Sequence, residues 1–334
     1  MTYLAARERE SRAKPWQFIA TGGRIAFVRW LPDSSALELV SGTYQQRFAR
    51  QDTRNGTPSS DAVASVDTSR LLNARFMRWN PDRHTFTQGA QAPAYPLLRA
   101  YSADGTRYAL SENKLHIALY DAPTGRWQRA VRASAPAQEV ALSSDGTLLA
   151  ALSVARIEVW DARTGVLRAT LHTQGEMQHL LFSPRGTFIG ALSSSQVCLW
   201  QAATGQPLHR IAPPFGGELS AFDFAPDERS LALTDEQARI ALYDLPTKVW
   251  QTQTDPASNT LYDVRFSPDG QCLATGGIGV VTLWKAQPLT PLRSIRVQGA
   301  PVEDTYFARV RFSPDSRHLA AETNFGKVVL CKLR

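Results

Sequence analysis

The side chains most often used in catalysis are scattered along this sequence rather than grouped. The phosphate-binding P-loop, the nucleophile motif G-x-S-x-G and the zinc motif H-E-x-x-H are all absent. The glycine cluster TGGIG at 275–279 lies between two predicted strands, which indicates a hairpin turn rather than a nucleotide-binding loop. The six histidines show no spacing typical of metal ligands and stand at positions 84, 116, 172, 179, 209 and 318. We therefore predict that the chain is not an enzyme, with no catalytic residue, no metal site and no cofactor.

Segment 42–69 contains residues that are better suited to binding a partner than to catalysis. Its first half, GTYQQRFARQDTR, combines aromatic and arginine side chains, the types enriched at the hot spots of protein interfaces. Its second half is polar and small, and begins with Asn55-Gly56, a hairpin-turn signal. The segment is therefore either an extended β-hairpin or a mobile insertion. The candidate contact residues are Tyr44, Arg47, Phe48, Arg50 and Arg54.

The overall charge permits an acidic partner without requiring one. The formal net charge is +7, and 31 of the 37 cationic side chains are arginine, the better bidentate ligand for carboxylate and phosphate. Arg126, Arg129 and Arg132 recur every three residues, which is not the period of a strand, and no series of stacking aromatics accompanies them. We interpret them as a solvated rim. Nucleic acid remains a possible partner but is not favoured.

Cysteine content and hydrophobicity bear on the environment of the chain. Cys198, Cys272 and Cys331 are widely spaced and lie in apolar runs, as reduced core residues do, which favours the cytoplasm. Residues 1–13 are charged and lack the apolar core of a signal peptide. No apolar run approaches the roughly 18 residues of a membrane helix. We expect a cytoplasmic protein that does not enter a membrane and is monomeric on its own.

These residues are held by a repeat of about 40 residues. Its most regular copy, 142–171, reads as short alternating strands joined by tight turns. The first turn of the copy, Ser-Ser-Asp-Gly from Ser143, recurs in steps of 41, 40, 42, 42 and 46 residues. The recurring turns begin at Ser102, Ser143, Ser183, Ala225, Ser267 and Ser313. An aromatic residue follows most of them by 17 or 18 positions, at Tyr120, Trp160, Trp200, Tyr243 and Trp284.

A four-stranded unit of this length, with Ser-Pro-Asp-Gly in its first turn and Trp-Asp closing its third strand, resembles the WD-repeat β-propeller family. Trp160-Asp161 is the one literal Trp-Asp pair, and Tyr120-Asp121 and Tyr243-Asp244 are near matches. The resemblance covers about residues 15–334. It implies an all-β, seven-bladed β-propeller of four-stranded antiparallel blades. Two features of the family are missing here: no Gly-His dipeptide precedes the first strand, and the Asp expected before the third strand is mostly absent. The family builds a side-chain hydrogen-bond network from these residues, so we expect apolar packing to stabilise the blades instead.

The number of blades follows from a further turn at Leu31 and a further aromatic at Trp79. These two positions are 48 residues apart, about 30 more than in the other copies. We favour seven blades with an insert at about 42–69, between the second and third strands of the first blade. The alternative is an eighth blade with a third strand near 51–56, which leaves only 28 residues before Trp79.

The two ends of the repeat region predict how the ring closes. The chain reaches VVLCKLR, the third strand of its last copy, without a fourth. Counting back from Leu31 by the spacing of the regular copy places a strand at KPWQFI, residues 14–19. We expect this N-terminal strand to join the last blade, so that residues 14–334 form one propeller after a charged segment, 1–13. Such pairing covers an otherwise open strand edge.

In the family, loops between the second and third strands lie on the same face as loops that join successive blades. The resemblance therefore implies one binding face, formed by the insert and the inter-blade loops. The implied function is a non-catalytic scaffold that binds a protein or peptide. The alternatives are an enzyme with its site at the central channel and a binder of nucleic acid or another polyanion. The inter-blade loops add the candidates Tyr95, Arg132, Glu176, His179, Phe215, Glu218, Asn259, Glu303 and Tyr306.

Overall fold

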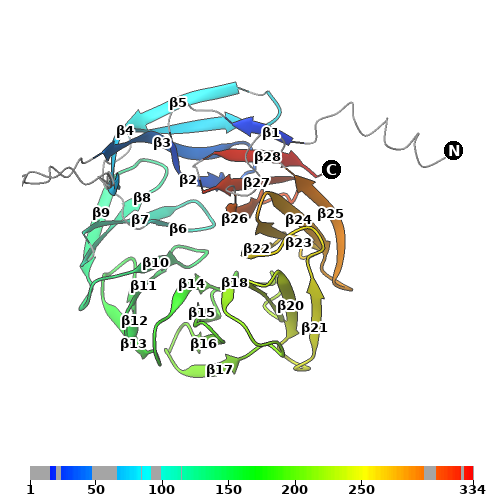
Figure 1. The fold of residues 1–334 in the computed structure, drawn as a ribbon. Coiled ribbons are helices and arrows are strands. Elements are labelled where there is room, and N and C mark those ends of the chain that lie inside the picture. The colour runs from blue at the N-terminus through cyan, green and yellow to red at the C-terminus, as the bar shows by residue number, and fades with distance from the viewer. Residues whose placement is uncertain are drawn as a thin grey trace, which may run out of the picture.

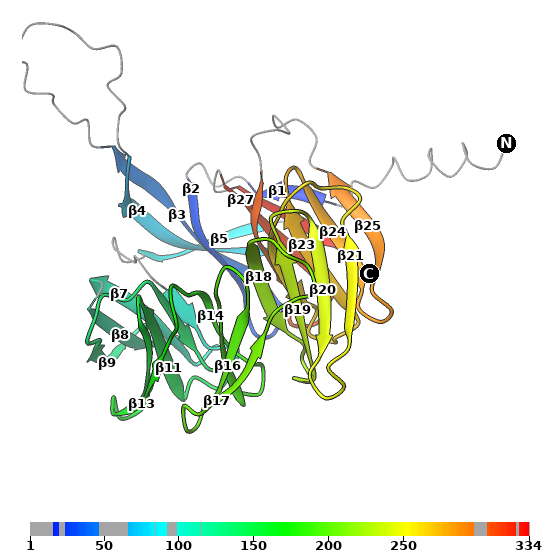
Figure 2. The ribbon, with the colours of Figure 1, turned by 60° about the horizontal axis from the view of Figure 1, so that its bottom comes forward.

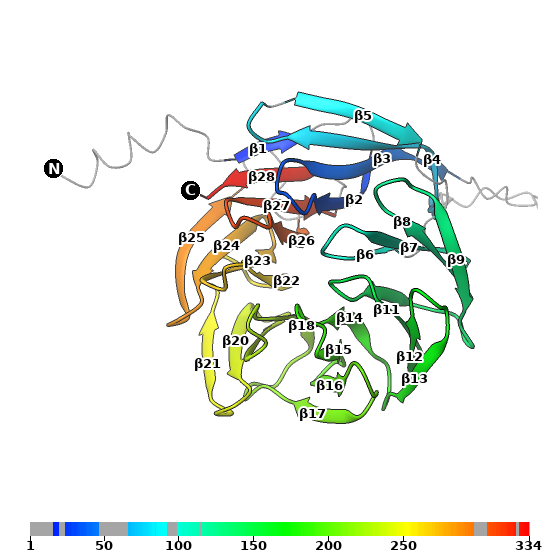
Figure 3. The same cartoon turned by 180° about the vertical axis from the view of Figure 1, so that it is seen from behind.

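Seven four-stranded antiparallel sheets stand around a common centre, as Figures 1 and 3 show from opposite sides. The structure is a computed structural model, and it describes residues 16–19, 24–46, 66–83, 85–91, 99–113, 115–296, 306–324 and 327–333. Every regular element among those residues is a β-strand. The predicted fold class, an all-β propeller of seven blades, is confirmed.

Each blade uses its strands in chain order from the centre outwards, except that the last blade takes its outer strand from the N-terminus. The first strands, nearest the centre, are β2 (Arg24–Trp30), β6 (Arg99–Tyr101), β10 (Glu139–Leu142), β14 (Gln178–Phe182), β18 (Leu219–Phe224), β22 (Leu261–Phe266) and β26 (Phe307–Phe312). The second strands are β3 (Leu37–Gln46), β7 (Arg107–Asn113), β11 (Leu148–Ser153), β15 (Phe188–Leu192), β19 (Ser230–Asp235), β23 (Cys272–Gly277) and β27 (His318–Thr323). The third strands are β4 (Val66–Asn80), β8 (His116–Asp121), β12 (Arg156–Asp161), β16 (Val197–Gln201), β20 (Arg239–Asp244), β24 (Val280–Lys285) and β28 (Val328–Lys332). The outer strands are β5 (Thr85–Gln91), β9 (Trp127–Arg132), β13 (Leu167–His172), β17 (Pro207–Ile211), β21 (Trp250–Thr254), β25 (Thr290–Arg296) and β1 (Trp16–Ile19).

The repeated turn joins the first and second strands of every blade with the same backbone hydrogen bond. In each, the N–H of the fourth turn residue donates to the carbonyl oxygen of the first, over 2.8–3.1 Å. The fourth residue has a positive φ, which glycine adopts without steric cost. Glycine stands there in four turns, and Ser34, Glu228 and Ser316 stand there in the other three.

The core lies between neighbouring blades. One cluster joins Ala232 and Ile240 of blade 5 to Val264, Leu273 and Trp284 of blade 6, all fully buried. Because each blade buries its faces against two neighbours, no blade is a separate packing unit.

The expectation that apolar packing alone stabilises the blades is wrong for blade 6. There the buried Trp284 indole N–H donates to Thr275 Oγ1 over 3.0 Å. The Thr275 hydroxyl in turn lies 3.4 Å from Oδ2 of the buried Asp255. A buried polar group needs such partners, since leaving it unpaired costs about 1–3 kcal/mol.

The predicted N-terminal strand closes the ring. β1 pairs antiparallel with β28, in register from Trp16 opposite Cys331 to Ile19 opposite Val328. Blades 7 and 1 are further joined where the Trp30 indole N–H donates to the Arg311 carbonyl oxygen over 3.1 Å. Residues far apart in the sequence thus complete a single sheet.

The first blade is the least regular. Its second and third strands, β3 and β4, pair out to Gln46 opposite Val66. Figure 2 shows these two strands reaching beyond the rest of the disc. Because the strands are antiparallel, this end lies on the face that carries the inter-blade loops, called here the loop face.

Candidate binding site on the loop face

Register shifts of the β-bulge type interrupt β2, β14, β18, β22 and β26 near their loop-face ends, and those in β14, β18 and β22 shape one site. The pairing of β14 with β15 shifts between Gln178 and Leu181, so that His179 falls within the irregularity. The pairing of β18 with β19 skips Ser220, and that of β22 with β23 skips Tyr262. A bulge re-aims the side chain that it leaves out of the ladder. His179, Ser220 and Tyr262 therefore form a set that regular strands would not present together.

Carboxylates position these first strands across blade boundaries. Glu139 accepts the backbone N–H groups of His179 and Leu180 over 2.9 and 2.7 Å. Asp223 accepts the N–H of Phe266 over 2.8 Å. Each acidic side chain thus holds the first strand of the following blade, and the bond to His179 helps to hold that residue at a φ of +54°.

Deeper in the ring centre, the acidic side chains are paired with arginines. Arg265 lies between Asp223, at 3.4 Å, and Asp263, at 3.1 Å. Arg311 lies 3.4 Å from the other oxygen of Asp263, which also accepts the N–H of Val310 over 2.9 Å. Burial raises the pKa of Asp223, against the opposing effect of Arg265. In the part of the chain that the structure describes, no three His, Cys, Asp or Glu side chains group as metal ligands would.

Nearer the loop face, one arginine holds the loop before β18. Arg239 Nε lies 2.6 Å from Asp235 Oδ2, its guanidinium stacks 4.5 Å from the centre of the Phe215 ring, and it donates to the Gly216 carbonyl oxygen. Gly217 follows at a φ of +134°, where any Cβ would lie 2.5 Å from the Arg239 guanidinium. This loop conformation therefore requires glycine at 217.

Two acidic residues on neighbouring loops, Glu218 before β18 and Glu236 in the β19–β20 turn, are joined through their backbones. The backbone N–H of Glu236 donates to the carbonyl oxygen of Glu218 over 3.2 Å. Both side chains are exposed, and neither has an ion pair or hydrogen bond among the described residues. The nearby Arg239 is already paired with Asp235. The loop face thus carries two carboxyl side chains without a neutralising partner, on residues whose backbones are hydrogen-bonded to each other.

These features enclose a cavity of about 280 Å³, called here the loop-face cavity. Four successive blades contribute to it. Two of the lining side chains are aromatic, and the rings of Tyr262 and Tyr306 lie 4.5 Å apart at a tilt of 33°. The lining residues are Gln178, His179, Glu218, Leu219, Ser220, Glu236, Tyr262 and Tyr306.

The protonation states of two lining residues follow from their surroundings. Burial lowers the pKa of His179, against the opposing effect of Glu139, so the imidazole is neutral at pH 7. Burial, with Tyr306 and Glu236 nearby, raises the pKa of Tyr262, so the phenol keeps its proton. The fixed charge of the cavity wall therefore comes from Glu218 and Glu236.

Three of the candidates drawn from the sequence meet in this cavity, namely His179, Glu218 and Tyr306. Arg132 and Glu176 are exposed elsewhere on the loop face, and Phe215 packs beneath Arg239 rather than in the cavity. Asn259 is exposed and does not line it. Tyr44 lies in β3, and its backbone pairs with that of Leu71 in β4. The remaining candidates lie outside the described residues and are Arg47, Phe48, Arg50, Arg54, Tyr95 and Glu303.

The sequence did contain a signal for two lining residues that were not predicted, Ser220 and Tyr262. Ser220 follows the predicted His179 by 41 residues and Tyr262 follows Ser220 by 42, the period of the repeat, so the three occupy one position in successive copies. Attention to loops included His179 but passed over Ser220 and Tyr262, since each lies just inside a strand. Glu236 had no comparable signal, because its place depends on the fold of another loop.

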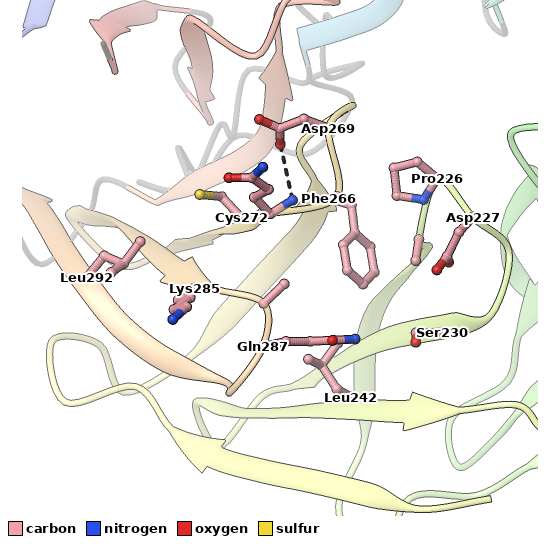
Figure 4. Close-up of a pocket in the computed structure, with 14 residues that line it drawn as sticks. Pro226, Asp227, Ser230, Leu242, Phe266, Asp269, Cys272, Lys285, Gln287 and Leu292 are labelled. Atoms are coloured by element: carbon pink, nitrogen blue, oxygen red, sulfur yellow. Dashed lines mark hydrogen bonds between the residues drawn. The ribbon is translucent and has the colours of Figure 1, made fainter. Parts of the chain in front are cut away.

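A larger cavity of about 560 Å³ lies on the opposite face, between blades 5 and 6. Its apolar lining includes Phe266, Leu242 and Leu292 (Figure 4). Its carboxylates are used within their own turns. Asp269 accepts the Gln271 N–H over 3.1 Å, drawn as a dashed line, and Asp227 accepts the Arg229 N–H over 2.9 Å.

Two further observations concern thiols and membranes. All three cysteines are free, with Cys331 buried and the other two half-buried. Across the described residues, no helix is long and apolar enough to cross a membrane.

Comparison with known proteins finds similarity in parts of the chain. The family model described as "WD domain, G-beta repeat" matches residues 248–285, the segment that contains Asp255, Thr275 and Trp284. The chain is also 28% identical over 115 residues to "Protein LST8 homolog" of Drosophila melanogaster. That match covers 32% of this chain and spans 35% of the relative. The chain is thus a seven-bladed β-propeller, and one of its repeats, in residues 248–285, is similar to the WD-repeat family.

Proposed function

We propose that this propeller is a non-catalytic platform that binds a protein or peptide through its loop face. WD-repeat propellers generally act as scaffolds for protein interactions. The observation that carries the proposal here is the loop-face cavity, to which four successive blades contribute side chains. Such a site is preorganised by the ring, so that a partner is bound without ordering the platform first.

The first-blade insert adds to the same face. β3 and β4 extend beyond the rest of the disc, and segment 47–65, which contains Arg47, Phe48, Arg50 and Arg54, joins them in the sequence. We propose that these side chains and Tyr44 contact the partner beside the cavity. Aromatic and arginine residues are the types that dominate the binding energy of protein interfaces.

The two alternatives fare less well on the described residues. An enzyme at the centre of the ring would need reactive side chains there, but Asp223 and Asp263 are bound to arginines and to backbone amides. A polyanion would meet the unneutralised Glu218 and Glu236 at the cavity. Both carboxylates repel phosphate and favour a partner with positive charge.

Affinity purification of the tagged full chain from its native cell, followed by measurement of the recovered partner, tests the proposal. Replacing residues 47–65 by Asn-Gly keeps the pairing of Gln46 with Val66 and should sharply reduce partner recovery. Glu218→Lys, which reverses a charge in the cavity lining, should also reduce partner recovery. Asp82→Asn is the matched control, since Asp82 is exposed in the β4–β5 turn on the opposite face. Full recovery with both loop-face variants, each melting like the wild type, would exclude this face as the binding surface.

A further inference from the structure

We infer that the loop-face cavity receives a basic side chain, arginine or lysine, from the bound protein or peptide. The inference rests on the proposed function, because it assigns a chemistry to one point of the same binding face. It concerns a cation carried by a peptide chain, as distinct from a metal ion or a free organic base.

The acidic side of the cavity is the first argument. Glu218 and Glu236 both line the cavity, their backbones are hydrogen-bonded to each other, and the nearby Arg239 is already paired with Asp235. The lining contains no Lys or Arg. On a chain with a formal net charge of +7, this is a local concentration of negative charge. A ligand cation would offset this negative charge and form charge-assisted hydrogen bonds with the carboxylates.

The aromatic side of the cavity is the second argument. Tyr262 and Tyr306 present two tilted rings, and Tyr262 is directed there by its bulge. The face of an aromatic ring attracts a guanidinium or ammonium group within about 6 Å, more strongly where water is partly excluded. The half-buried His179 is neutral at pH 7 and adds no repulsion.

Size and polarity supply the third argument. At about 280 Å³, the cavity lies below the range of about 300–1,000 Å³ typical of sites for drug-sized ligands. It is suited to a single side chain. The Ser220 hydroxyl and the Gln178 amide offer additional acceptor oxygens for a donor that carries several N–H groups. Arginine and lysine side chains meet all of these conditions.

A random peptide library displayed on phage, panned against the immobilised full chain, provides ligands without knowledge of the native partner. Selected peptides are synthesised with a fluorescent label, and their affinity is measured by anisotropy. We expect enrichment of arginine or lysine at one position. Replacing that residue by citrulline or glutamine, which removes the charge, should weaken binding roughly tenfold or more.

The matching protein variants are Glu218→Gln and Glu236→Gln, with Asp82→Asn as the control. Each glutamine variant should weaken binding roughly tenfold, and the control should leave it unchanged. Tyr262→Phe keeps the ring and should bind the peptides nearly as the wild type does. Tyr262→Ala removes the ring and should bind them more weakly. Because both glutamic acids are exposed, the variants should melt within a degree or two of the wild type.

The outcomes separate this inference from the proposed function. Selected peptides that lack basic residues, or that bind equally to both glutamine variants, overturn the inference. If those peptides still lose affinity when residues 47–65 are replaced, the loop face stands as the binding surface. If no selected peptide responds to any loop-face change, both proposals fail.

Discussion

Three non-glycine residues occupy left-handed positions in the repeated turn, and each has a partner in the preceding blade. Glu228 Oε1 accepts the Arg185 N–H over 2.7 Å, and Ser316 Oγ accepts the Asp269 N–H over 3.1 Å. Ser34 Oγ likewise accepts the Asp315 N–H over 2.9 Å. A bond between neighbouring turns thus offsets the steric cost of about 1–2 kcal/mol for a side chain at such a φ.

Glu228 offers a test at the scale of one residue. Glu228→Ala removes the bond to Arg185 and keeps the steric cost, whereas Glu228→Gly removes both. We expect the alanine variant to be less stable than the glycine variant by about 1 kcal/mol, measured by urea unfolding. Equal stability of the two variants would show that the positive φ carries no cost at this turn.

At the scale of the element, the first turns depend on ionised aspartates. Burial would raise the pKa of Asp145, but hydrogen bonds from Ser143 and Thr147 together outweigh that effect and lower it. The pKa of Asp315 is lowered in the same way, by bonds from Ser313 and Arg317. In Asp33 the bonds from Ser35 dominate and lower the pKa.

Stability should therefore decline in acid. For a carboxyl group whose pKa is lower in the folded state, the stabilisation is complete above the unfolded value, 3.8, and is lost as the pH falls through the folded value. The melting temperature should be nearly the same at pH 6 and pH 5, and it should fall below about pH 4.

Asp145→Asn isolates one turn in the same experiment. It should cost about 0.5–1 kcal/mol at pH 6, given the partial exposure of the carboxyl group, and much less at pH 3. A cost independent of pH would mean that the geometry of the side chain, and not its charge, stabilises the turn.

The elements were largely predictable from the sequence, whereas the cavity was not. Two independent signals per copy, the turn and the aromatic, indicated the blade count even in the last copy, where Cys331 stands 18 residues after the turn at Ser313 in place of the aromatic. The bulges at Ser220 and Tyr262 depend on cross-strand register, which local patterns do not encode. The neighbouring positions of Glu218 and Glu236 depend on the bonds of Arg239, which join separate segments through folding.

At the scale of the whole molecule, closure by β1 joins the two ends of the propeller. Deleting residues 1–20 removes β1 and leaves one edge of β28 unpaired. We expect the melting temperature to fall by several degrees or more, since an exposed edge also promotes association. Deleting residues 1–13 leaves β1 in place and serves as the control. A 1–20 deletion that melts like the full chain would refute the closure role of β1.

The pairing of β1 with β28 also has a consequence for biosynthesis. A ribosome adds about 5–20 residues per second, so β1 leaves it roughly 15–60 s before its partner exists. Throughout that time, six blades can form while the seventh lacks three strands. A chaperone that holds the nascent N-terminus would then protect the one strand whose partner is made last.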